Sequence, residues 1–211
     1  DARLIAALLE QDGTQTRPVA HTPQSGYQRL SSGRTAVVLD VGMPPPGAYS
    51  TAAHAGFLAF EMSIGIQRVV VNCGPAPFAD GQWDVALRAT AAHSTLTVSD
   101  TSSASVLLEG RLARLLGRRL TGGPATVETR RSESAQGLHV AASHDGYAAR
   151  FGLVHQRRMM LSPNGAGLSG ADRLIPAGAG KARKRRAPIP FAIRFHIHPD
   201  VRISLSQSGG S

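Results

Sequence analysis

The sequence predicts an all-β fold, an antiparallel β-sandwich of many short strands. The 23 glycines and 13 prolines of the 211-residue chain interrupt any long helical pattern after the first few residues, because both residue types punctuate turns. Strand-like segments follow one another at spacings of about 10 to 15 residues, which is typical of a sandwich. A hydrophobic content of 42% with 18% charged residues is that of a folded domain with a substantial core.

The predicted elements begin after a polar segment. Residues 3–9 are typical of a helix end and residues 11–26 of a linker, so we assign 1–26 to a linker or the end of a preceding helical region and 27–211 to the β domain. Segments 27–30 and 35–40 flank Ser31-Ser32-Gly33-Arg34, a hairpin signature. Three prolines at 44–46 predict a rigid loop, since proline donates no backbone N–H.

A second hairpin is predicted over residues 49–74. Residues 55–62 alternate as a strand does, residues 68–71 form a β-branched run, and Gly65 supplies the turn between them. His54 would then enter one strand and Asn72 leave its neighbour, which places the two side by side. The segment at 75–92 is irregular or weakly helical, and residues 112–116 fit no class well. Further strands are expected at 94–99, 126–130, 138–143, 153–161, 167–174 and 192–198.

A net charge of +9 predicts attraction to polyanions such as nucleic acids, anionic membranes or acidic polysaccharides. Nucleic acid is the less favoured partner, because the sequence has no zinc-finger spacing, ribonucleoprotein signature or GXXG clamp. The single cysteine, Cys73, excludes an internal disulfide. No apolar run has transmembrane length, and no signal peptide is visible. Because the chain begins with Asp1, we expect a fragment of a longer protein.

Several motifs together point to one family. They are Ala52-Ala53-His54-Ala55-Gly56, Ala59-Phe60-Glu61, Asn72 and Gly74, Ala92-His93-Ser94-Thr95, His144-Asp145-Gly146-Tyr147 and His155-Gln156-Arg157-Arg158. In these residues the chain resembles the C-terminal β-domain of the heparinase II/III family of polysaccharide lyases, over roughly residues 25 to 200. The resemblance implies an N-terminal α/α toroid as the missing partner domain, an anionic polysaccharide as ligand, and a location in the bacterial cell envelope or periplasm.

The resemblance implies cleavage of a uronic-acid glycan by β-elimination, which needs a base, an acid and a group that stabilises the carboxylate. The family takes much of this set, including a tyrosine, from the toroid, and one histidine from the β-domain. That histidine position is Ala52 here. We therefore identify no catalytic residue and expect this fragment to be inactive alone. The alternative is a non-catalytic module that binds anionic polysaccharide.

The resemblance also implies a structural zinc site, whose ligand positions are His54, Asn72 and His93. Two imidazoles and a carboxylate suit Zn²⁺, whereas a neutral asparagine is a poor ligand. The other interpretation is that the two histidines bond the backbone or each other.

His155, Arg157 and Arg158 are the candidate substrate-binding residues. Positions 155 and 157 share one face of a strand and would line a carbohydrate groove, unless that face is simply a solvated basic surface. Two further basic segments, the loop at 176–189 and the cluster Arg111, Arg114, Arg118 and Arg119, would contact a polyanion or remain solvated.

Overall fold

The structure is a computed structural model that describes residue 7 and residues 23–75, 81–107, 110–178 and 188–204. The predicted linker at 1–26 lies almost entirely outside these residues, as does the basic stretch 179–187. Among the described residues, no helix is long and apolar enough to cross a membrane.

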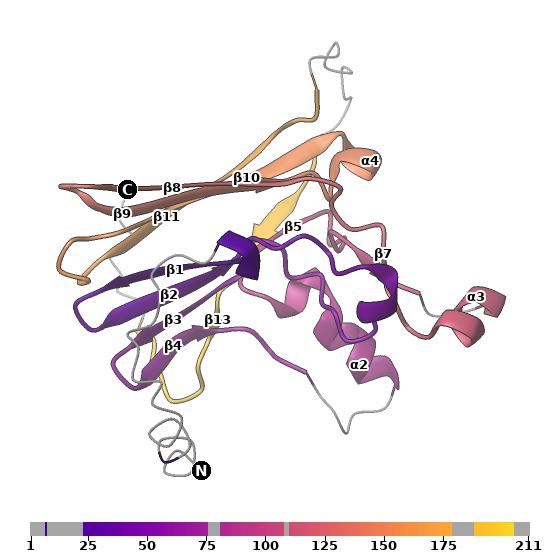
Figure 1. Cartoon of the computed structure of the whole chain (residues 1–211), viewed down its shortest axis with the longest axis horizontal. Helices are drawn as coiled ribbons and strands as arrows, with labels where there is room; N and C mark the ends of the chain where they lie inside the picture. Colours follow the sequence, from indigo (N-terminus) through magenta and orange to yellow (C-terminus); the bar gives the residue numbers. More distant parts are fainter. Residues whose placement is uncertain (1–6, 8–22, 76–80, 108–109, 179–187, 205–211) are drawn as a thin grey trace.

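Two antiparallel sheets lie one above the other (Figure 1), which confirms the predicted sandwich. The lower sheet has five strands in the order β1-β2-β3-β4-β13 and the upper has four in the order β11-β10-β9-β8. The lower strands are β1 (Tyr27–Ser32), β2 (Thr35–Asp40), β3 (Phe60–Ile64), β4 (Gln67–Val71) and β13 (His196–Ile197). The upper strands are β8 (Val127–Ser134), β9 (Gly137–His144), β10 (Leu153–Leu161) and β11 (Leu168–Pro176).

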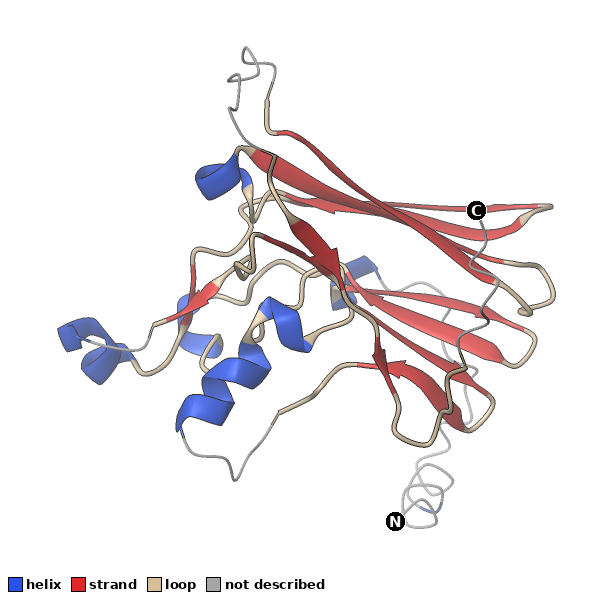
Figure 2. Cartoon of the chain, turned by 180° about the vertical axis from the view of Figure 1, so that it is seen from behind, coloured by secondary structure: helices blue, strands red, loops and turns tan. Residues whose placement is uncertain are grey.

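Shorter elements close one end of the sandwich, best seen from behind (Figure 2). Two small sheets pair β5 (Leu96–Val98) with β12 (Phe191–Ile193), and β6 (Ser105–Val106) with β7 (Leu120–Thr121). The α-helices are α2 (Gly81–Arg88), α3 (Gly110–Leu116) and α4 (Ala148–Phe151), and the 3-10 turns are η1 (Pro23–Ser25), η2 (Gly47–Tyr49) and η3 (Thr90–Ala92). Helix α3 projects away from the sheets.

The main core fills the space between the sheets. Alternate residues of β1 and β2 meet alternate residues of β9 and β10, and Leu30, Val37 and Leu161 are fully buried there. Two smaller clusters lie under the loops, around Phe57 and around Tyr147. Tyr147 donates its hydroxyl to the Leu96 carbonyl at 2.9 Å, which anchors the segment 144–147 to β5.

Some predicted boundaries were wrong. Strand β3 begins at Phe60, whereas alternation had suggested residue 55. Residues 55–59 are all buried, so they form a packed loop with no solvent face. Leu58 adopts a left-handed φ of 56°, and its N–H donates to the Asp40 carbonyl at 3.0 Å. The segment at 192–198 also divides, because β12 pairs with β5 and β13 with β4.

Candidate functional site

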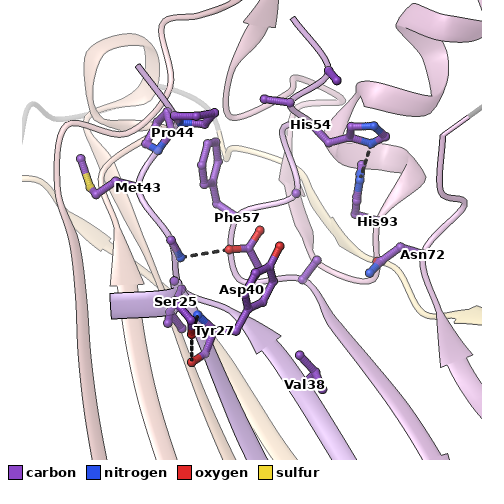
Figure 3. Close-up of a pocket in the computed structure, with 18 of the residues that line it drawn as sticks. Ser25, Tyr27, Val38, Asp40, Met43, Pro44, His54, Phe57, Asn72 and His93 are labelled. Carbon is purple, nitrogen blue, oxygen red and sulfur yellow. Dashed lines mark hydrogen bonds between the residues drawn. The ribbon is translucent and has the colours of Figure 1, made fainter. Parts of the chain in front are cut away.

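A pocket of about 1030 Å³ lies at one end of the lower sheet. Strands β1 and β3 begin at this end and β2 and β4 finish there, since Tyr27 pairs with Asp40 and Met62 with Val70. The loop at 42–59 forms the opposite wall, and the three predicted zinc-ligand positions lie in the lining with position 52. Figure 3 shows His54, His93 and Asn72 on one side, with Asp40 and Tyr27 facing the pocket from the sheet.

The wall that carries Ala52 and His54 is held by a buried arginine. Arg88, at the end of α2, is 2% exposed. Its guanidinium donates to the carbonyls of Ser50 and Ala53 at 3.0 and 2.8 Å. The backbone N–H of Ala55 donates to the Arg88 carbonyl at 2.8 Å. Position 52 is thus fixed in the pocket wall as a methyl group, which can neither accept nor donate a proton.

His54 and His93 form a hydrogen-bonded pair, 3.1 Å apart between Nδ1 of His54 and Nε2 of His93. Because Nδ1 of His93 lies 2.8 Å from the Ala89 carbonyl, this nitrogen must donate. Nε2 of His93 is then the acceptor and Nδ1 of His54 the donor. Burial lowers the pKa of His93 to about 4 and also lowers that of His54. Both rings are therefore neutral at pH 7, and they bond each other and the backbone.

The Asn72 carboxamide is already engaged on both sides. Its Oδ1 accepts from the Ser94 N–H at 2.8 Å, and its Nδ2 donates to Glu61 Oε1 at 3.1 Å. The second of these bonds requires an amide, because an ionised aspartate would have no proton to offer Glu61. This position is therefore adapted to asparagine.

The donors present do not fit a zinc centre of the usual kind. Two imidazole nitrogens face each other, but the third position is a neutral amide whose oxygen is occupied by a backbone bond. No group of three or more His, Cys, Asp or Glu side chains among the described residues is placed to hold a metal ion. Zinc binding through His54, Asn72 and His93 stays a prediction for metal analysis.

The remaining polar groups of the pocket are acidic or neutral. Burial raises the pKa of Asp40 to about 6, although the Gly42 N–H bonded to its Oδ1 at 3.0 Å acts in the opposite direction. Asp40 and Glu61 in turn help to raise the pKa of Tyr27. Of the described residues that line the pocket, none is lysine or arginine. The pocket in this domain therefore offers a uronate carboxylate no cationic partner.

The candidate substrate-binding residues are not together on one surface. His155 and Arg157 do share a face of β10, as predicted, but they are 0% and 2% exposed and point between the sheets. The solvated-face interpretation is equally inconsistent with this burial. Arg158 is exposed on the outer face. His155 and Arg157 are thus not placed to line a groove, because the core encloses them.

Sequence reasoning missed the partner that explains this burial. Asp172 on β11 pairs with Arg157 in register, and accepts from Arg157 Nε and Nη2 at 2.8 and 3.0 Å and from His155 Nε2 at 2.7 Å. Arg157 Nη1 also donates to the Leu58 and Ser94 carbonyls at 2.7 and 2.9 Å. His155 Nδ1 is also hydrogen-bonded to His144 Nε2 at 3.2 Å. The apparent sugar-contacting motif is a buried polar network that ties the upper sheet to the loops at Leu58 and Ser94.

Comparison with known proteins agrees with the class that the fold defines, an antiparallel β-sandwich domain. A family model described as "Heparinase II/III-like, C-terminal" matches residues 14–211. The chain therefore belongs to the heparinase II/III-like family, as its C-terminal domain.

Two known proteins are similar to this chain. FtsZ-localized protein C of Caulobacter vibrioides is 38% identical over 209 residues, covering 98% of this chain and 36% of that protein. The chain thus spans about a third of the length of this curated relative. Crystal structures of heparan sulfate lyase HepC from Pedobacter heparinus, as a mutant and unmodified, match with TM-scores of 0.56 and 0.55. At 18% identity, with 83% of this chain and 26% of HepC covered, they support the fold alone.

Proposed function

We propose that this domain binds an anionic polysaccharide without cleaving it, as part of a longer heparinase II/III-like protein of the bacterial cell envelope. The rest of that protein, with an N-terminal helical toroid, is its proposed intramolecular partner. Zinc is not part of the proposal.

One observation carries the non-catalytic part. The pocket has a methyl group at Ala52, where the resemblance to the lyases expects a histidine, and its described lining offers no cation to a uronate carboxylate. Proton abstraction next to a carboxylate needs both a base and charge stabilisation. His93 does not supply the base, because its Nδ1 donates to the Ala89 carbonyl and its Nε2 accepts the His54 N–H. A base at His54 would still lack a cation for the carboxylate, since the described lining has none.

The anionic ligand is supported by charge. The chain carries 23 Lys and Arg against 14 Asp and Glu, a net charge of +9. A surface of this sign raises the local concentration of a polyanion and speeds its association.

Two assays test the proposal. Purified chain and its Ala52→His variant are incubated with heparan sulfate and other uronate glycans, and unsaturated uronate is followed by ultraviolet absorbance. We expect no product from either, and binding of the glycan by the unmodified chain in calorimetry. Sustained product formation by the unmodified chain would overturn the non-catalytic assignment in favour of a lyase that takes its base from elsewhere. Absence of glycan binding would refute the proposal that an anionic polysaccharide is the ligand.

A second candidate function rests on the relative's name. Identity to FtsZ-localized protein C is 38%, against 18% to the heparan sulfate lyase. We therefore also consider a domain of a protein that localises with FtsZ. Fluorescent fusions of the full-length parent, imaged together with labelled FtsZ, separate this candidate from an envelope location.

A further inference from the structure

The outer face of the upper sheet carries three arginines outside the pocket. Arg130 on β8, Arg158 on β10 and Arg173 on β11 are exposed, whereas their chain neighbours Met159 and Arg157 are buried. Strand alternation therefore turns the three side chains away from the core. Figure 1 shows this sheet as the outermost layer of the sandwich. We call these three residues the arginine face.

Register places the three arginines close together. Arg158 and Arg130 both pair with Ala141 of the strand between them, so their Cα atoms are about 10 Å apart. Arg158 pairs with Ala171 and Gln156 with Arg173. Arg173 is thus the diagonal neighbour of Arg158, at about 7 to 8 Å. The three arginines therefore occupy one continuous patch across β8 to β11.

These arginines have no acidic partner within the described part of the chain. None of the ion pairs or side-chain hydrogen bonds there involves Arg130, Arg158 or Arg173. Glu128 shares the face, two residues from Arg130 on β8, but forms no ion pair with it. By contrast, the buried Arg157 has its carboxylate in register. The arginine face retains its positive charge for a partner.

Small side chains cover the sheet surface next to Arg130 and Arg158. A groove of about 510 Å³ crosses the face, with Arg130 and Arg158 in its lining beside the small residues Ala141, Ser169 and Ala171. Small side chains allow a linear polymer to lie close to the sheet while the longer guanidinium groups reach its charged groups. Guanidinium binds carboxylate and sulfate-like oxygens through paired N–H donors.

We propose that the arginine face binds a linear anionic polysaccharide laid across β8 to β11. The proposal rests on the proposed glycan-binding function and assigns it a surface remote from the family pocket. Nucleic acid fits this surface less well, because the outward residues of these strands include no Phe, Tyr or Trp on which a base could stack. A membrane surface fits less well too, because none of the large apolar side chains that are exposed in the described part of the chain lies on strands β8 to β11.

The test uses heparin as the probe and three forms of the chain. These are the unmodified chain, an R130Q/R158Q/R173Q variant, and a control R34Q/R68Q/R202Q variant that removes equal charge from exposed arginines elsewhere. We expect the first variant to bind heparin at least about tenfold more weakly and with a shallower salt dependence, since three charge-assisted contacts are lost. The control is expected to remain within about twofold. Circular dichroism checks that all three forms fold alike.

Each other outcome has a defined meaning. If the unmodified chain binds heparin and the R130Q/R158Q/R173Q variant binds equally well, the arginine face is refuted while the proposed function survives. Equal weakening in the control would show diffuse attraction by net charge and also refute it. No heparin binding by the unmodified chain would refute the proposed function itself. Stronger competition by duplex DNA, polyglutamate or anionic vesicles than by heparan sulfate would overturn the assigned class of partner.

Discussion

Replacing Asp172 by Asn is expected to destabilise the domain strongly. This carboxylate is 8% exposed and faces Arg157 and His155, whose side chains are 3% and 0% exposed. The Asp172→Asn variant keeps the size of the side chain but leaves the Arg157 guanidinium with backbone carbonyls as its partners. A buried charge would then be uncompensated.

Two considerations set the magnitude. Removing one partner of a buried ion pair costs about 3 to 5 kcal/mol. Burial alone would raise the pKa of Asp172, but hydrogen bonds from His155 and Arg157 outweigh it and hold the pKa at about 2 instead of 3.8, equivalent to about 2 kcal/mol. We expect a loss of about 2 to 5 kcal/mol at pH 7.

Urea unfolding followed by circular dichroism measures this loss, with Asp100→Asn as control. Asp100 also pairs with an arginine, at 3.3 Å, but is 88% exposed, so its variant should lose less than about 1 kcal/mol. Because the pKa of folded Asp172 is depressed, its contribution is complete above about pH 4 and is lost toward about pH 2. The difference from the unmodified chain should therefore be equal at pH 7 and 5 and smaller at pH 3.

A loss below about 1 kcal/mol at pH 7 would refute this account of the network. So would a difference that grows as the pH falls from 5 to 3, because that sign belongs to a group whose pKa is raised by folding.

The remaining predictions concern the pocket. Asp40→Asn should stabilise the chain by about 1 to 3 kcal/mol at pH 7 and leave its stability unchanged at pH 4. The reason is that burial raises the pKa of Asp40 to about 6, so ionisation above that pH is costly. Urea unfolding at the two pH values checks this, and destabilisation at pH 7 would contradict it. Asn72→Asp should supply the missing anionic ligand for zinc. Elemental mass spectrometry should then find about one zinc per chain in this variant, and none in the unmodified chain or in Asn72→Asp with His93→Ala. Zinc in the unmodified chain would show that the amide of Asn72 suffices as a ligand. Arg88→Met should cost about 2 to 4 kcal/mol by removing the guanidinium donor from the Ser50, Ala53 and Arg118 carbonyls. Thermal melting against the exposed Arg68→Met measures this, and equal melting temperatures would contradict it.

The sequence predicts the fold well where strands have one buried and one open face. Strand β10 spans Leu153–Leu161 as predicted because its side chains alternate between the core and solvent. The pattern fails at residues 55–59, where every side chain is buried, since period two then carries no information. No local sequence pattern predicts the left-handed backbone conformation of Leu58, because leucine rarely adopts a positive φ.

The site is predicted less completely, because its chemistry depends on partners distant in the chain. Spacing alone places His155 and Arg157 on one face but does not say which face is buried. That depends on Asp172, which becomes a neighbour only through the pairing of β10 with β11. The His54 and His93 pair was foreseen as one of two interpretations. The arginine face was missed except for Arg158, because Arg130 and Arg173 join it only through strand register.

The return of the C-terminal segment to the first sheet has a consequence for biosynthesis. Strand β13 completes the edge of β4, and β12 completes β5, although more than 90 residues separate the strands of each pair in the sequence. Such pairings must wait until residue 197 has left the ribosome, and closing long loops slows folding. We therefore expect the N-terminal half to emerge with an open sheet edge, a surface on which incomplete chains aggregate and chaperones act.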